Sequence, residues 1–165
     1  MAASTDATAT SKEPELVVTR ILNAPRPLVF KAWTDPEQVA RWWGPQGFVT
    51  TLCEMNIQPG GAYRVGMRSP QGTHHVKRGV YREIVEPERI VFTYAWEDAE
   101  GRPGHETLVT VTFAELGTKT KLTLHQATFE NISARDSHQV GWTSCLERFA
   151  EYLAGSYRYK GVVSC

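Results

Sequence analysis

The side chains best suited to chemistry lie in one stretch, residues 74–85, HHVKRGVYREIV. His75, Tyr81 and Glu83 are separated by even numbers of residues, so in a β-strand they share one face. A histidine, a tyrosine and a glutamate that face a cavity can act as general acid and base near neutral pH. These three are therefore the candidate catalytic or polar-anchor residues. The alternative is that this face of the strand points to solvent, and the sequence leaves that choice open.

The other reactive residue types do not form a recognisable site. His74 and His75 are adjacent, so in a strand they point to opposite faces and cannot chelate one ion together. Cys145 is two helical turns from His138, too far for a thiolate–imidazole pair, and Cys53 has no activating neighbour in the sequence. The motifs GxSxG, HExxH and GxGxxG are absent. We therefore expect no metal, no cofactor and no covalent catalysis.

Aromatic side chains form a second group of candidates, for binding rather than catalysis. The chain has five Trp, six Tyr and six Phe, and small-molecule sites have apolar walls with a few polar groups. We expect a cavity whose entrance is gated by Trp42, Trp43 and Phe48. The residues expected to complete its walls are Tyr63, Met67, Phe92, Tyr94, Trp142, Cys145 and Phe149. The alternative is that these side chains only fill a hydrophobic core.

Short β-branched and aromatic runs between turn signals predict an antiparallel meander that would position these residues. The strands are expected at about residues 15–22, 48–57, 62–69, 74–85, 88–97, 106–115 and 118–127. Two short helices are expected between the first two strands, at residues 27–33 and 36–43, because Pro36 and Glu37 suit a first helical turn. Alternation places Val109, Val111 and Phe113 on an inward face.

One long helix is expected near the C-terminus, at residues 134–154, with Gly155 as its natural end. Its apolar stripe includes Trp142, Leu146 and Phe149. A sheet with one apolar face needs such a helix to cover it. The predicted fold is therefore α+β, with a curved antiparallel sheet wrapped around the C-terminal helix. It forms one domain at residues 15–154, flanked by tails at residues 1–14 and 155–165.

Composition excludes several classes of protein. Lys and Arg together number 18, as do Asp and Glu, so the formal net charge is +0 and bulk charge would not attract nucleic acid. No apolar run is long enough to insert into a membrane, and the first residues lack a signal sequence. Three cysteines without CxxC spacing indicate reduced thiols rather than disulfides. We expect a cytoplasmic protein.

Several segments, in their order and spacing, resemble the START/Bet v 1-like (SRPBCC) superfamily. Within it, the chain is similar to single-domain bacterial homologues of the heat-shock protein 90 ATPase activator. The resemblance covers about residues 15–154. The matching segments are Asn23-Ala24-Pro25, residues 29–33 (VFKAW), Asp35-Pro36-Glu37, residues 41–45 (RWWGP), residues 59–64 (PGGAYR), residues 79–84 (GVYREI) with Pro87, and Gly141-Trp142.

The resemblance implies a helix-grip fold with a cavity between the sheet and the C-terminal helix. In many relatives this cavity binds a lipid, an isoprenoid or a polycyclic aromatic molecule, and we expect such binding or carriage here. Some members are cyclases, aromatases or hydrolases, which is the first alternative. Chaperone activation or stress-response interaction is the second, with a chaperone as partner. The protein would be a monomer or a homodimer.

Overall fold

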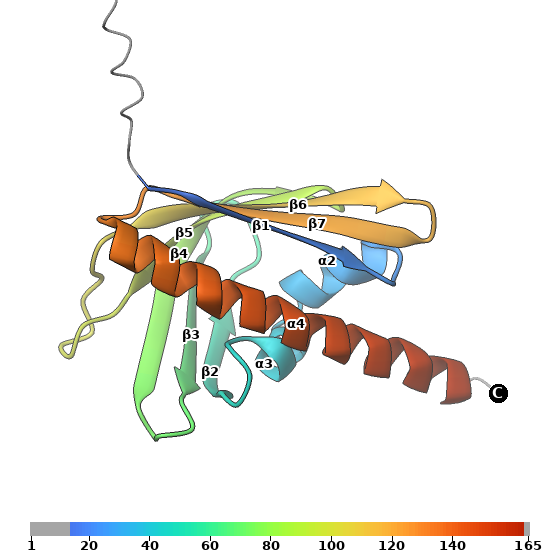
Figure 1. The fold of residues 1–165 in the computed structure, drawn as a ribbon, viewed down its shortest axis with the longest axis horizontal. Helices are drawn as coiled ribbons and strands as arrows, with labels where there is room; N and C mark the ends of the chain where they lie inside the picture. The colour runs from blue at the N-terminus through green and yellow to red at the C-terminus, as the bar shows by residue number, and fades with distance from the viewer. Residues whose placement is uncertain (1–13, 164–165) are drawn as a thin grey trace, which may run out of the picture.

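The computed structural model describes residues 14–163, with side chains as far as residue 155. Seven strands and three helices follow one another along the chain (Figure 1). They are β1 (Leu16–Leu22), α2 (Arg26–Thr34), α3 (Pro36–Trp42), β2 (Val49–Met55), β3 (Ala62–Arg68), β4 (His74–Val85), β5 (Arg89–Trp96), β6 (Thr107–Leu116), β7 (Lys119–Ala127) and α4 (Ile132–Val163). The expected element order is confirmed.

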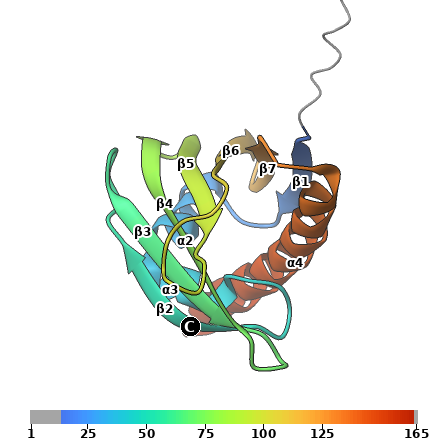
Figure 2. The same ribbon diagram turned by 90° about the vertical axis from the view of Figure 1, so that its left-hand side faces the viewer.

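The strands form a single curved sheet, in the order β1-β7-β6-β5-β4-β3-β2 with antiparallel neighbours. Figure 2 shows the sheet curling around an interior that α4 crosses, while α2 and α3 lie at its far end. Because a curved sheet has one concave apolar face, the three helices cover that face and enclose the core. This is the helix-grip arrangement that the sequence predicts.

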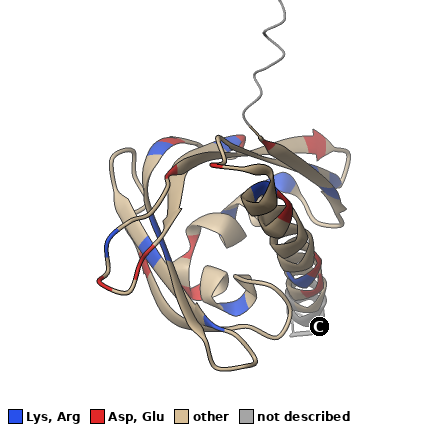
Figure 3. Ribbon diagram, turned by 60° about the vertical axis from the view of Figure 1, so that its left-hand side comes forward, with Lys and Arg blue, Asp and Glu red and all other residues tan. Residues whose placement is uncertain are grey.

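Local sequence explains how the key elements begin and face the core. The Asp35 carboxylate accepts a hydrogen bond from the Glu37 backbone amide at 3.1 Å and caps α3, whose first residue is Pro36. In β6, Val109, Val111 and Phe113 are buried, as their spacing predicts. Charged residues of both signs are interspersed over the sheet and α4 (Figure 3).

The predicted end of the last helix is wrong. The helix continues through Gly155 to Val163, so most of the expected C-terminal tail is helical. A glycine inside a helix costs only about 1 kcal/mol relative to alanine, and no proline follows to stop the helix. The expected N-terminal tail, residues 1–14, lies outside the described residues except for its last residue.

None of the helices in the described part of the chain is long and apolar enough to cross a bilayer.

Candidate functional site

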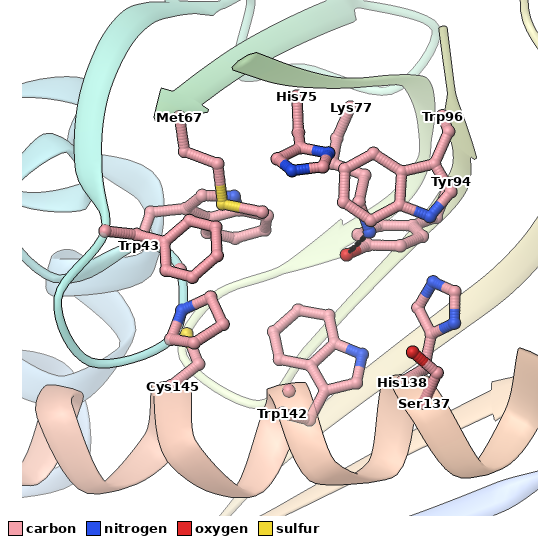
Figure 4. Close-up of a pocket in the computed structure, with 14 residues that line it drawn as sticks. Trp43, Met67, His75, Lys77, Tyr94, Trp96, Ser137, His138, Trp142 and Cys145 are labelled. Atoms are coloured by element: carbon pink, nitrogen blue, oxygen red, sulfur yellow. Dashed lines mark hydrogen bonds between the residues drawn. The ribbon is translucent and has the colours of Figure 1, made fainter. Parts of the chain in front are cut away.

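A cavity of about 220 Å³ lies between the concave face of the sheet and α4. Its walls come from three places: the loop after α3, the strands β3, β4 and β5, and one face of α4 (Figure 4). The lining residues are Trp43, Gly44, Pro45, Phe48, Met67, His75, Lys77, Tyr94, Trp96, Ser137, His138, Gly141, Trp142 and Cys145. We call this the main cavity. Seven of these fourteen side chains carry an aromatic ring, counting the two histidines.

Six of the ten expected binding residues line the main cavity: Trp43, Phe48, Met67, Tyr94, Trp142 and Cys145. The other four lie elsewhere. Tyr63 and Phe92 line a second, much smaller cavity of about 20 Å³. Trp42 and Phe149 are wholly buried in the core, where the Trp42 indole N–H donates to the Ala32 carbonyl at 3.1 Å. Trp42 is therefore a packing residue in this structure and does not line the main cavity.

The structure does not bring the three candidate acid–base residues together. His75 lines the main cavity, whereas Tyr81 lines the small one. Glu83 is exposed and forms an ion pair with Arg89 at 2.9 Å. Tyr81 lies six residues further along β4 than His75, a distance of about 20 Å. A one-residue shift in the pairing of β4 with β5 between Tyr81 and Glu83 turns Glu83 away from the face that Tyr81 occupies.

Lys77 is one of seven lining residues that are not among the candidates expected from the sequence. It is only 1% exposed, and its Nζ lies 3.5 Å from the centre of the Tyr94 ring and 3.4 Å from that of Trp96. The ammonium donates a hydrogen bond to the Tyr94 hydroxyl oxygen (Figure 4). Burial holds the pKa of Lys77 well below its ordinary value. The available signal was its even spacing from His75, which places both on the same face of the strand.

Sequence comparison places this fold in a known family. A family model described as "Activator of Hsp90 ATPase homolog 1-like protein" matches residues 23–154. The chain belongs to this family. The AHSA1-like family is part of the SRPBCC superfamily, whose members typically bind hydrophobic ligands. The resemblance found in the sequence is thereby confirmed. The comparison with curated proteins found no match.

Solved structures share the fold of this AHSA1-like protein. The crystal structure of an AHSA1 protein from Silicibacter pomeroyi matches with a TM-score of 0.79 at 23% identity, over 87% of this chain and 99% of that chain. A protein from Chromobacterium violaceum matches with a TM-score of 0.74 at 28% identity, over 84% and 96%. A solution structure from Arthrobacter aurescens matches with a TM-score of 0.77 at 25% identity, over 86% of each chain.

Two histidines face the main cavity of the AHSA1-like protein from opposite sides. Burial lowers the pKa of His75, with the charge of Lys77 as a second cause. Burial and Lys77 also lower the pKa of His138, to about 4. The His138 Nδ1 lies 2.8 Å from the Ala134 carbonyl oxygen, which can only accept, so Nδ1 carries the proton. Both imidazoles are therefore neutral at neutral pH.

Cys145 and Tyr94 are also neutral in this cavity. Burial raises the pKa of the Cys145 thiol to about 12 and raises that of the Tyr94 hydroxyl well above its ordinary value. A thiol held in its protonated form is a poor nucleophile. Cys145 therefore serves as a small apolar wall residue, as the sequence indicates.

A buried chain of hydrogen bonds holds the Trp142 side chain in place in the cavity wall. Its indole N–H donates to the Gln126 side-chain oxygen at 2.7 Å, and the Gln126 amide donates to the Thr107 hydroxyl at 2.8 Å. The Thr107 hydroxyl in turn donates to the Tyr94 carbonyl at 3.0 Å. This chain links α4 to β7, β6 and β5, so the position of one wall residue is coupled to the sheet.

The loop of residues 43–48, which supplies Trp43 and Phe48, is fastened to α4 by polar contacts. The Arg148 guanidinium donates to the carbonyls of Trp43 at 3.0 Å and Pro45 at 3.2 Å. The Gln46 backbone amide donates to the Ser144 hydroxyl at 2.9 Å. Gly44 has φ +96°, which suits glycine, and a Cβ there would lie 2.9 Å from the Met67 sulfur. The loop therefore sits tightly over the cavity.

The described residues contain no group of three or more His, Cys, Asp or Glu side chains placed to hold a metal ion.

Proposed function

We propose that this AHSA1-like protein binds and carries a hydrophobic or amphipathic small molecule in its main cavity, in the cytoplasm. The observation that carries the proposal is the cavity itself, with walls of Trp, Tyr, Phe and Met side chains and few polar groups. Such walls are typical of small-molecule sites. Each CH₂ group that a ligand removes from water contributes about 0.8 kcal/mol to binding.

The volume limits the size of the molecule. Cavities for drug-sized ligands measure roughly 300–1,000 Å³. At about 220 Å³, the main cavity fits a smaller molecule, or part of a longer one. A small ligand therefore suits it better than a sterol-sized one.

Native mass spectrometry of freshly purified protein, followed by organic extraction, tests the proposal. We expect a stoichiometric adduct, either as isolated or after incubation with a fatty acid or an aromatic hydrocarbon. Gly141→Leu supplies a variant that fills the cavity, because Gly141 lines it and has open space around its Cβ position. Gly155→Leu is the matched control, since Gly155 lies on the same helix, has the same open space and does not line the cavity.

We expect Gly141→Leu to lose the adduct and Gly155→Leu to retain it. Wild-type protein that stays bare with every probe, or an adduct that Gly141→Leu retains, would contradict binding in the main cavity.

The two alternative functions have less support. The acid–base enzyme would use His75, Tyr81 or Glu83 and needs two titratable groups within reach of one point in the cavity, and of these three only His75 lines the main cavity. The chaperone-partner hypothesis depends on family likeness alone, and a fold hosts many functions. No contact or surface of the described residues favours either one.

A further inference from the structure

The main cavity contains the buried amine of Lys77, which has no anionic partner among the described residues. None of its fourteen lining residues is acidic, and no carboxylate lies within salt-bridge distance of Lys77 in the part of the chain that the structure describes. The groups that face Lys77 are Tyr94 and His75 from the sheet and His138 and Cys145 from α4. All four are neutral or cationic in their ordinary states near neutral pH.

A fully buried lysine lowers the stability of a protein unless another group compensates for the hydration that the ammonium loses. Removing an ammonium group from water costs several kcal/mol, and fully buried lysines are almost always paired. The rings of Tyr94 and Trp96 provide part of the compensation through cation–π contacts. A cation–π contact does not replace a carboxylate partner, so the site retains an unmet preference for an anion.

The walls around Lys77 favour a flat ligand. The rings of Trp43 and Trp142 are perpendicular, with centroids 5.6 Å apart, and Tyr94 lies 5.6 Å from Trp142. Aromatic rings prefer edge-to-face or offset-stacked neighbours at such distances. A cavity of about 220 Å³ bounded by these faces suits one or two fused rings.

We propose that the ligand of the main cavity is a small aromatic carboxylic acid, with its carboxylate paired to Lys77 and its ring packed against the aromatic wall formed by Trp43, Tyr94 and Trp142. The inference rests on the proposed function and narrows it to one chemical class. Both parts of the molecule have a counterpart in the cavity. An ammonium–carboxylate hydrogen bond is roughly twice as strong as a neutral one, and the low dielectric of the site strengthens it further.

Isothermal titration calorimetry at pH 7 with two matched probes, 2-naphthoate and 2-naphthalenemethanol, tests the inference. The probes share a ring system and differ in the acid group, and the ionised acid is the better hydrated of the two. Without a cation in the cavity, the alcohol would therefore bind more tightly. We expect wild-type protein to bind the acid at least about tenfold more tightly than the alcohol, since a charge-assisted hydrogen bond is worth about 1.5–3 kcal/mol.

Two variants test the contribution of the Lys77 charge to binding separately from that of the cavity shape. Lys77→Met removes the ammonium and keeps a side chain of similar length. It should weaken naphthoate binding about tenfold or more and leave the alcohol within twofold. Lys121→Met makes the same substitution at an exposed position of β7 and should change neither affinity.

The outcomes distinguish the two proposals. If wild-type protein binds the alcohol as tightly as the acid, or if Lys77→Met binds naphthoate like wild type, the acid assignment is wrong and binding in the cavity stands. If neither probe binds, the proposed function fails for aromatic ligands and the acid assignment fails with it. The comparison of the two probes on wild-type protein remains a valid test even if a variant fails to fold.

Discussion

At the scale of single residues, the chemistry of this protein is dominated by one side chain in an unfavourable position. Lys77 would be better solvated anywhere on the surface, yet it lies between Tyr94 and Trp96 inside the cavity. Charged groups retained in apolar surroundings at a cost in stability are enriched at functional sites. In the proposed function, the stability of the protein and its preference for an acidic ligand are linked through the same amine.

Lys77→Met should make the free protein more stable. The substitution removes a buried amine whose charged form is costly to bury and retains most of the packing, so we expect a gain of about 1–4 kcal/mol, the range found when buried ion pairs are replaced by apolar residues. Because the folded state lowers the pKa of Lys77 below its ordinary value of about 10.5, the unfolded chain binds a proton more readily. The stability of the wild type therefore falls as the pH drops below about 10.5.

The measurement is urea unfolding of both proteins at pH 7 and pH 10. The advantage of the variant should be larger at pH 7. Equal stability of the two proteins at both pH values would show that Lys77 is not penalised by burial.

His138 should make the fold sensitive to mild acid. Its pKa is about 4 in the folded protein, against an ordinary value of 6.5, chiefly because of burial. Between these values the unfolded chain binds the proton and the folded chain does not, so stability declines as the pH falls from about 6.5 to about 4. We expect a loss of about 1–3 kcal/mol, since each unit of pKa difference is worth about 1.4 kcal/mol and the ring is partly exposed.

His138→Phe removes this titration and retains an aromatic ring beside Tyr94, Trp96 and Phe129. Chemical denaturation from pH 7 to pH 4 should show a shallower decline in the variant. Parallel curves for the two proteins would assign the acid sensitivity to other groups.

At the scale of elements, the cavity depends on contacts that join segments far apart in the chain. Trp142 on α4 reaches the sheet through Gln126, and the loop of residues 43–48 reaches α4 through Arg148. Sequence periodicity does not reveal such contacts, because they depend on which strand lies beneath which turn of the helix. The shape of the cavity is therefore set by a few polar contacts between elements.

Gln126→Leu should destabilise the fold by about 1–3 kcal/mol, because it leaves the buried Trp142 indole N–H without its acceptor. Trp142→Phe removes the donor instead. The double variant should lose less stability than the sum of the losses in the two single variants. The reason is that it contains neither the indole N–H nor the amide oxygen that accepts its hydrogen bond. Thermal unfolding of the four proteins gives the coupling energy, and strict additivity would mean that this hydrogen bond contributes nothing.

Arg148→Ala should loosen the loop of residues 43–48 and leave the sheet unchanged. The arginine donates to carbonyls of Trp43 and Pro45, and losing two charge-assisted hydrogen bonds lowers the free energy of local opening. Hydrogen exchange by mass spectrometry should show protection in this loop reduced about tenfold, with β5 and β6 unaffected. Glu147→Ala, at an exposed neighbouring position, is the control, and equal exchange in the two variants would contradict the role of Arg148.

At the scale of the whole molecule, the fold could be predicted far more fully than the site. Turn signals and alternation, such as that of Val109, Val111 and Phe113, set the number and order of strands because they act locally. Predicting the site would have required knowledge of contacts between residues that are far apart in the sequence. The shift at Tyr81 and Glu83 depends on how β4 pairs with β5, and the inward position of Lys77 opposes the ordinary preference of lysine for solvent.

The overall charge balance leads to a prediction for the molecule in solution. With a formal net charge of +0 and a pI near 7.0, molecules repel one another least near neutral pH. We expect solubility to pass through a minimum close to pH 7 and to rise on either side. Precipitation with polyethylene glycol from pH 6 to pH 9 measures this, and a steady trend across pH 7 would contradict it.

The hydrogen bonds that fasten the loop of residues 43–48 to α4 would control how fast a ligand enters and leaves the cavity. Water can replace the hydrogen bonds that Arg148 donates to the loop and that the Ser144 hydroxyl accepts from it when the loop detaches, whereas the core beneath stays packed. Entry and release would then require only a local opening, much less costly than global unfolding. Residence time would follow the strength of the Arg148 contacts and affinity would follow Lys77, so the two properties could change independently of each other.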